Sequence, residues 1–160
     1  MAEFKTNVMR LLEQKKINFS AHEYPHGDSA VDGLTVARIT GKDPNMVYKT
    51  LVTRGASKKI FVFVIPVGLE LHLKKAAKVV GEKSIAMIAV NEINALTGYV
   101  RGGCSPIGMK KQYSTVYHSD ILELATVMVS AGKIGYQVEI SPMDLIKLTN
   151  GKSADVAVEE

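Results

Sequence analysis

The sequence has a single cysteine, Cys104, and only four histidines among its 160 residues. One cysteine excludes an intramolecular disulfide, and the histidines do not form a zinc-binding spacing with it. His22 and His26 are four residues apart, but Pro25 between them argues against a shared helical face. We therefore expect neither a metal site nor a cofactor.

Long apolar runs are also missing. No stretch approaches the roughly 18 apolar residues that a membrane-spanning helix needs, and the opening segment MAEFKTNVMRLLEQKK mixes charged with apolar residues, unlike a signal peptide. We expect a cytoplasmic protein with no membrane partner. Because 46% of the residues are hydrophobic, the chain can build one core, and we predict a single domain over residues 1–160.

The sequence has only a small excess of positive over negative charge. Twenty Lys and Arg residues against sixteen Asp and Glu give a net charge of +4. This mild basic excess allows an anionic partner without requiring one. The sequence shows no motif for stacking single-stranded bases, so any binding of RNA should be weak and sensitive to salt.

Capping residues and apolar spacing predict several helical segments. They are a helix from Thr6 or Asn7 to about Lys16, a helix within 29–40 closed by Gly41, one or two turns from Asp43 to Tyr48, and helices over 70–81, 91–98 and 141–151. Most of these segments begin at a residue that can cap a helix or end at a glycine.

Strands are predicted between these helices by β-branched and aromatic runs. They cover 49–54 and 59–67, which the turn GASK joins as a hairpin, and then 113–118, 125–132 and 134–141; residues 18–28 look extended, and 154–160 resembles a frayed tail. The run 59–67 is apolar on both faces, which predicts a central strand. Without a regular βαβ order, we expect the mixed α/β class: a mixed, curved sheet or β-barrel flanked by helices.

The segment 98-GYVRGGCSPIGMKK-111 concentrates glycine, proline and serine around the only thiol. One interpretation makes Cys104 a nucleophile, which would need a base within hydrogen-bond reach; the other makes it a small packing residue. Its spacing is not that of a phosphate-binding loop, and Pro106 removes a donor. Glycines expose backbone N–H groups, so we favour a cradle for a carbonyl oxygen, an ester or a ribose edge over a simple connection.

A second turn and one lysine are further candidates for the same site. The turn 130-SAGKIG-135 separates two strands that can neighbour the loop, and Ser130 can exchange a hydrogen bond there. Lys49 opens a strand directly after a helical turn, where an ammonium group would be held beside a pocket. Sequence physics alone leaves Lys49 indistinguishable from an ordinary surface lysine.

Four segments in one order carry a resemblance to a known family. They are 44-PNMVYKTLV-52, 70-ELHLKKAAKVVG-81, 98-GYVRGGCSPIGMKK-111 and 129-VSAGKIGYQVEISPMDL-145. Together they resemble the YbaK/EbsC family of aminoacyl-tRNA deacylases, in its Cys-tRNA(Pro) deacylase branch, from about Lys5 to the C-terminal region. The resemblance implies a mixed sheet or barrel flanked by helices, with a pocket between them.

The resemblance also implies a function and a set of site residues. The reaction would remove cysteine wrongly attached to proline tRNA, and the protein would be a free-standing relative of the editing domain of some prolyl-tRNA synthetases. A complex with prolyl-tRNA synthetase would then supply the choice of tRNA by proximity. Catalytic roles are implied for Lys49, Gly102 and Gly103, and substrate binding for Tyr24, Ser105, Pro106, Ser130, Gly132 and Lys133.

The implied mechanism uses a nucleophile that belongs to the substrate. The cysteine thiol of the aminoacyl group attacks its own carbonyl, releasing tRNA and a cyclic thiolactone that later hydrolyses. A free thiol has a pKa of about 8.5, so part of it is already thiolate at neutral pH. The Gly102-Gly103 backbone would hold the carbonyl oxygen and Lys49 would stabilise negative charge or anchor the terminal nucleotide, while Cys104 would be a bystander.

The basic residues beside the loops complete this interpretation. Arg101, Lys110, Lys111 and Lys133 are expected to meet the acceptor-stem phosphates. Each of the four histidines, His22, His26, His72 and His118, is expected to be structural.

Two positions depart from the family pattern. An aromatic residue that some members carry before the second helix is replaced by Asp32-Gly33, and a Ser-Gly-Gly-Lys turn reads Ser130-Ala131-Gly132-Lys133. Both departures bear on how tightly a small amino acid side chain is enclosed.

Other functions stay open at this point. One is editing of another mischarged tRNA, bearing alanine or serine, with water or a ribose hydroxyl as nucleophile. Another is a non-catalytic module that binds a nucleotide or an RNA end. The sequence leaves open whether Cys-tRNA(Cys) is also cleaved.

Overall fold

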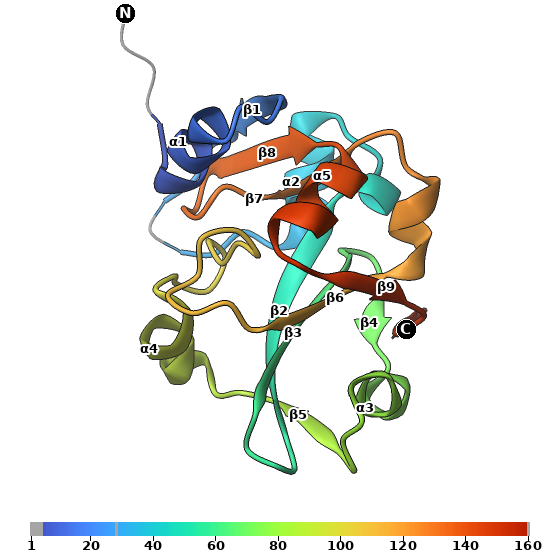
Figure 1. Ribbon diagram of the computed structural model, residues 1–160. Coiled ribbons are helices and arrows are strands. Elements are labelled where there is room, and N and C mark those ends of the chain that lie inside the picture. Colours follow the sequence, from blue (N-terminus) through green and yellow to red (C-terminus); the bar gives the residue numbers. More distant parts are fainter. Residues whose placement is uncertain (1–4, 28, 160) are drawn as a thin grey trace, which may run out of the picture.

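The computed structural model of the chain describes residues 5–27 and 29–159 (Figure 1). Residues 1–4 and 160 of the expected domain, and Asp28 of the expected extended segment, lie outside the described residues. The α-helices are α1 (Asn7–Gln14), α2 (Gly33–Thr40), α3 (Leu73–Val80), α4 (Ile93–Thr97) and α5 (Pro142–Leu148), and short 3-10 helices cover Pro44–Met46, Val90–Glu92 and Ser119–Glu123. The strands are β1 (Phe19–Glu23), β2 (Tyr48–Gly55), β3 (Ile60–Pro66), β4 (Glu70–Leu71), β5 (Ile85–Met87), β6 (Ser114–His118), β7 (Val127–Ser130), β8 (Tyr136–Ile140), β9 (Lys152–Ala154) and β10 (Ala157–Val158).

The helix ends follow the capping residues in the sequence. The Thr6 side chain accepts a hydrogen bond from the Met9 amide and begins α1, and Ser141 caps α5 in the same way. Helix α2 ends at Gly41, whose φ of 71° is the left-handed conformation that glycine adopts without strain. Helix α2 begins later than expected, because the Asp32 side chain accepts from the Thr35 amide and fixes the first turn there.

The strands form a five-stranded mixed sheet in the order β5-β2-β3-β6-β9, a three-stranded antiparallel sheet in the order β1-β8-β7, and a short β10-β4 pair. In the large sheet β2 pairs antiparallel with β3 and β5, whereas β6 pairs parallel with β3 and β9. A bridge between Val47 and Met128 joins the two larger sheets where β2 begins. The expected mixed α/β class is confirmed.

Strand β3 is buried on both faces, as its apolar run predicted. Val62 and Val64 point into a core shared with α1, β7 and β8. The alternate residues Phe61, Phe63 and Ile65 point into a second core against α3 and the chain end. Because successive side chains of a strand face opposite ways, one strand serves both cores. The hairpin of β2 and β3 therefore runs through the whole molecule (Figure 1).

The sheet does not close into a barrel over residues 5–27 and 29–159. Strands β5 and β9 are the two edges of the large sheet, and they do not pair with each other. Of the two expected arrangements, the curved sheet flanked by helices is therefore the one observed. No helix within the described part of the chain has the length and apolarity to cross a bilayer.

The chain end differs most from its prediction. Residues 154–160 were expected to fray, but Lys152–Ala154 pairs with β6 and Ala157–Val158 pairs with β4. The prediction was wrong because the segment is short and contains charged residues, which suggested an exposed tail. In the structure Val156 and Ala157 are both buried. Two shorter errors lie in the helices: residues 70–71 form β4 ahead of α3, and residues 90–92 form a 3-10 turn ahead of α4.

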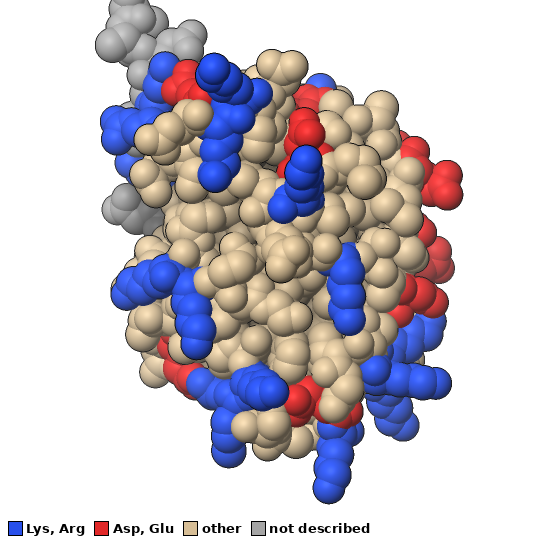
Figure 2. Space-filling model, viewed as in Figure 1, with Lys and Arg blue, Asp and Glu red and all other residues tan. Residues whose placement is uncertain are grey.

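Charged side chains are spread over the face of the molecule seen in Figure 2. On this face, groups of Lys and Arg side chains are separated by uncharged surface, and acidic side chains lie beside some of them. Such a distribution fits the small net charge of +4. It favours weak contacts with an anionic partner over a strong nucleic-acid-binding groove.

Candidate functional site

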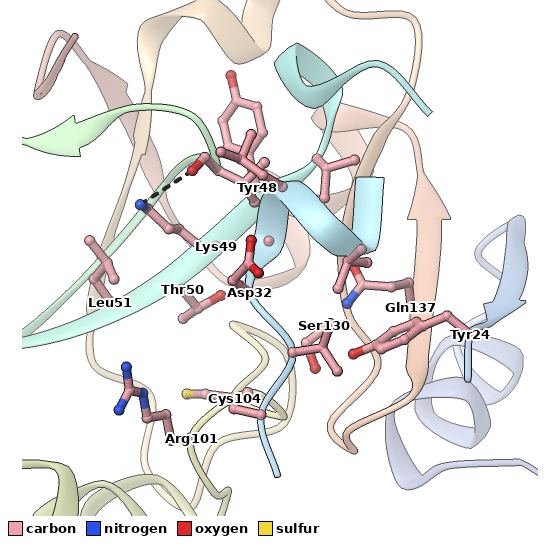
Figure 3. Close-up of a pocket in the computed structure, with 18 residues that line it drawn as sticks. Tyr24, Asp32, Tyr48, Lys49, Thr50, Leu51, Arg101, Cys104, Ser130 and Gln137 are labelled. Carbon is pink, nitrogen blue, oxygen red and sulfur yellow. Dashed lines mark hydrogen bonds between the residues drawn. The ribbon is translucent and has the colours of Figure 1, made fainter. Parts of the chain in front are cut away.

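A pocket of about 750 Å³ lies where the two larger sheets meet. Its walls come from the end of β1, the segment leading into α2, the beginning of β2, the glycine-rich loop, and the ends of β7 and β8 (Figure 3). The lining residues are Tyr24, Ala30, Val31, Asp32, Gly33, Leu34, Val36, Val47, Tyr48, Lys49, Thr50, Leu51, Val67, Arg101, Gly102, Cys104, Ser130 and Gln137. A cavity of this size accommodates a small molecule or the end of a larger one.

Four of the site residues expected from the sequence line this pocket. Tyr24, Lys49, Gly102 and Ser130 come from four separate segments and meet there. Lys49 and Arg101 lie on one side, while Tyr24 and Ser130 lie on the other (Figure 3). The pocket thus has a cationic side and a neutral polar side.

The other expected residues, Gly103, Ser105, Pro106, Gly132 and Lys133, do not line the pocket. Gly103 packs against the turn after β7: a Cβ at Gly103 would lie 3.0 Å from the Ile134 nitrogen. The Ser105 hydroxyl is buried and accepts from the Ile107 amide, next to the buried Pro106. These contacts keep the glycine-rich loop in place.

The turn after β7 lies against this loop, as the sequence suggested. The Gly132 amide donates to the Ser130 hydroxyl at 3.1 Å, and a Cβ at Gly132 would lie 2.9 Å from a Tyr99 ring carbon. Lys133 is exposed on the same turn. The backbone of this turn therefore fixes the hydroxyl of Ser130 at the pocket wall.

Lys49 reaches the pocket from the beginning of β2. Its side chain is half-buried, and Nζ donates to the Val67 carbonyl oxygen at 3.4 Å. Val67 follows β3, whose Ile65 is paired with Lys49 in the hairpin. The hairpin thus holds the ammonium group against one wall of the pocket (Figure 3).

Gly102 is the loop residue that needs to be glycine. Its φ is +87°, and a Cβ there would lie 2.6 Å from the Ala30 Cβ and 2.9 Å from the Ala30 Cα. Any other residue would strain the backbone and displace the neighbouring segment. The close approach of residues 30 and 102 narrows the pocket between them.

Cys104 lines the pocket, but its chemistry does not suit a nucleophile. Burial raises the pKa of its thiol to about 11, an effect that a hydrogen bond with Thr97 partly offsets. The thiolate is the reactive form, so the thiol is nearly all protonated and unreactive at neutral pH.

The two departures from the family pattern have different consequences. Asp32 lines the pocket, and hydrogen bonds from the Thr35 hydroxyl and amide lower its pKa. Gly33 lies so close to Val67 that a Cβ would be 2.3 Å from Cγ1 of that valine. Ala131, in contrast, is fully buried in the core and does not line the pocket.

Three polar residues that line the pocket were not singled out from the sequence: Tyr48, Thr50 and Gln137. Each has a buried oxygen for which the described residues provide no hydrogen-bond partner. The sequence pattern predicted a strand over residues 134–141 and indicated no role for Gln137. In the structure Gln137 is only 6% exposed, on a strand that pairs with β1 more than a hundred residues earlier in the chain, and a short sequence pattern does not show that pairing.

The described residues contain no group of three or more His, Cys, Asp or Glu side chains that could hold a metal ion. The histidines have contacts of a structural kind: His72 caps α3 through the Lys75 amide, and His118 accepts from two backbone amides.

Solved structures with the same fold are found at low sequence identity. One is described provisionally as a trans-editing enzyme for prolyl tRNA synthetase: it is 22% identical, with a TM-score of 0.81, and the match covers 98% of this chain and 99% of that chain. A hypothetical protein is 21% identical with a TM-score of 0.86, over 96% of this chain and 100% of that one. These structures show that the fold is shared.

Sequence comparison identifies the family. The model of the aminoacyl-tRNA editing domain matches residues 30–148. A relative from Enterococcus faecalis, provisionally named Cys-tRNA(Pro)/Cys-tRNA(Cys) deacylase EbsC, is 41% identical over 98% of this chain and 95% of its own length. The chain therefore belongs to the aminoacyl-tRNA editing domain family, and the resemblance found in the sequence is confirmed.

Proposed function

We propose that this chain, as an aminoacyl-tRNA deacylase of the editing family, removes cysteine from mischarged Cys-tRNA(Pro), with the substrate thiol as nucleophile. The observation that carries the proposal is the character of the pocket. It combines the Lys49 ammonium and the Gly102 backbone with a Cys104 thiol whose pKa is raised to about 11. A site of this kind positions an ester and stabilises charge, while its own thiol stays protonated.

The other groups in the pocket also argue for a nucleophile on the substrate. Among the described residues, those that line the pocket include no histidine. Asp32 is a weak base, because the Thr35 hydroxyl and amide lower its pKa. The hydroxyls of Tyr24, Thr50 and Ser130 therefore lack a base that would make them nucleophiles.

The proposed reaction balances without any further reagent. The cysteine sulfur forms a bond to its own carbonyl carbon, and the ester bond to the tRNA ribose breaks. The thiol proton ends on the released ribose hydroxyl, and water later opens the thiolactone to free cysteine. In this scheme the Gly102 segment accommodates the carbonyl oxygen and Lys49 stabilises the negative charge that develops there.

The test exchanges one atom of the substrate. Proline tRNA charged with cysteine and the same tRNA charged with serine are incubated with the protein, and the remaining ester is measured. Rapid loss of cysteine with serine retained is expected, because a serine hydroxyl does not ionise comparably. Equal loss of both would indicate water as nucleophile and a broader editing role, and loss of neither would favour a binding module.

The choice of tRNA forms a separate part of the proposal. With a net charge of +4 and scattered cations, the chain alone should distinguish tRNAs poorly. We propose that a complex with prolyl-tRNA synthetase raises the local concentration of Cys-tRNA(Pro). Adding the synthetase should increase the rate on Cys-tRNA(Pro) relative to Cys-tRNA(Cys), and an unchanged ratio would remove the complex from the proposal. These substrates would place the reaction in the cytoplasm.

A further inference from the structure

The pocket contains a buried amide side chain whose oxygen atom has no hydrogen-bond partner within the described residues. The Gln137 residue is only 6% exposed, it lines the pocket, and the described residues provide no partner for its Oε1 atom. Buried polar side chains in folded proteins nearly always have a hydrogen-bond partner. An exception that faces a pocket indicates a group prepared for a ligand.

No hydrogen bond from the described residues to the Gln137 Oε1 atom stabilises the fold. Gln137 contributes its backbone to β8, where it is paired with His22 of β1 and Ser130 of β7. Its neighbour Val138 packs into the core on the opposite face of the strand. The amide group instead points from β8 toward the pocket, on the side of Ser130 and Tyr24 (Figure 3).

The charges around the pocket indicate which end of a substrate meets Gln137. Lys49 and Arg101 lie on the opposite side, where they suit the phosphates of a tRNA end (Figure 3). The Oε1 atom of Gln137 is buried, and the residue lines the pocket, so a small group that enters the pocket suits this place better than a bulky one. The aminoacyl group is the small end of the substrate, and in this orientation the ribose and the rest of the tRNA lie toward the cationic side.

Within an aminoacyl ester, only one group is a strong hydrogen-bond donor. The carbonyl and ester oxygens only accept, and a thiol is a weak donor. The α-ammonium group has three N–H donors and a positive charge. The Asp32 carboxylate, which also lines the pocket, adds a favourable negative potential, and its low pKa keeps it ionised.

We infer that Gln137 is a specificity-determining residue that accepts a hydrogen bond from the α-amino group of the aminoacyl ester. The inference rests on the proposed deacylase function and extends it to a residue that holds the amino acid in place. Anchoring the amino group fixes the Cα atom, and this leaves the side-chain sulfur directed at the carbonyl carbon.

The test removes each partner of this contact in turn. Gln137→Met keeps the size of the side chain and removes the amide, and 3-mercaptopropionic acid is cysteine without its amino group. Proline tRNA is charged with either acid, and kcat/KM of deacylation is measured for the wild type, Gln137→Met and the control Gln14→Met. Gln14 is exposed on α1 and does not line the pocket.

The expected result is selective for the amino group. Gln137→Met should lose about 10- to 100-fold on the cysteine ester, the range for a hydrogen bond to a charged group, and change less than about 2-fold on the 3-mercaptopropionyl ester. The control should match the wild type on both. For each ester, kcat/KM of the wild type is divided by that of Gln137→Met, and the two quotients are compared. This comparison cancels the intrinsic difference in reactivity between the esters.

Thermal unfolding provides a second readout. Replacing an unsatisfied buried amide by an apolar side chain of similar shape should leave Tm unchanged or raise it. A lowered Tm with equal losses on both esters would show a structural role and overturn the inference. Equal losses with a normal Tm, or no loss at all, would also overturn it. If the wild type cleaves neither ester, the proposed function itself fails and the inference falls with it.

Discussion

At the scale of single residues, the site depends on where β2 begins. The consecutive residues Lys49, Thr50 and Leu51 all line the pocket, because the strand starts at the junction of the two sheets. Lys49 is half-buried and its Nζ contacts the Val67 carbonyl. The hairpin sets its position, so the cation is held at a fixed place in the pocket.

Replacing Lys49 tests this role directly. Lys49→Ala should lower the rate of Cys-tRNA(Pro) deacylation by about 10²- to 10³-fold, the typical loss when one group that stabilises an oxyanion is removed. Single-turnover deacylation with excess protein separates this loss from weaker binding. A mutant that keeps the wild-type rate would remove Lys49 from the mechanism.

The matched control is a lysine outside the pocket. Lys74 is exposed on α3 and does not line the pocket, so Lys74→Ala should keep the wild-type rate. A comparable loss in both mutants would indicate a general effect of positive charge on tRNA binding.

The pocket residues differ in how far the sequence could predict them. Lys49, Tyr24, Gly102 and Ser130 were expected from the family resemblance, and all four line the pocket. Local pattern alone would not have distinguished Lys49 from a surface lysine. Gln137 could not be predicted, because the pocket around it is formed by segments that lie far apart in the chain, such as those of Tyr24, Val36 and Ser130.

At the scale of elements, the helix caps, the hairpin and the central strand β3 followed from the sequence, whereas the chain end did not. The signals for the former are local: Thr6, Asp43 and Ser141 each accept from an amide two or three residues ahead. Strand β9 is held by β6, about 35 residues earlier in the chain, and β10 by β4, more than 80 residues earlier. Pairings at such separations are not visible in a short segment.

A buried histidine secures this chain end. The Nδ1 atom of His118 accepts from the amides of Val156 and Ala157, each at 3.2 Å. Since Nδ1 accepts, the proton of the neutral ring lies on Nε2, which faces Asp120 at 3.5 Å. The His118 residue is only 4% exposed.

His118→Ala should therefore destabilise the protein by about 1–3 kcal/mol, the cost of leaving buried amides without an acceptor. Urea unfolding measures the loss, and hydrogen exchange should show faster exchange at residues 152–158 than elsewhere. Lys75→Ala is the matched control, because Lys75 binds Asp155 of the same segment through an exposed ion pair. Exposed pairs contribute about 0–1 kcal/mol, so equal losses in the two mutants would contradict the role assigned to His118.

At the scale of the whole molecule, one carboxylate ties the small sheet to its surroundings. Glu139 of β8 accepts from the Thr126 hydroxyl at 2.6 Å and contacts His22 at 2.9 Å and Lys42 at 3.2 Å. These partners come from before β7, from β1 and from the segment after α2. The contacts therefore hold the elements that form the neutral side of the pocket.

The same contacts make the stability of the protein depend on acid. The hydrogen bond from Thr126, followed by those from His22 and Lys42, lowers the pKa of Glu139 below its ordinary value of 4.5, while partial burial opposes them. A carboxylate with a lower pKa in the folded state binds its proton more readily when the chain is unfolded. Its contribution to stability is therefore fully present above the unfolded value and is lost as the pH falls through the folded value.

The variant Glu139→Gln removes this titration while keeping the shape of the side chain. At pH 7 it should be less stable than the wild type, and the difference between the two free energies of unfolding should shrink as the pH falls below about 4.5. Urea unfolding from pH 7 to pH 3 measures both curves. Glu123→Gln, an exposed glutamate of the 3-10 helix Ser119–Glu123, serves as control and should follow the wild type throughout. Parallel curves for Glu139→Gln and the wild type would show that these contacts do not stabilise the ionised carboxylate, and the neutral side of the pocket would then depend on packing alone.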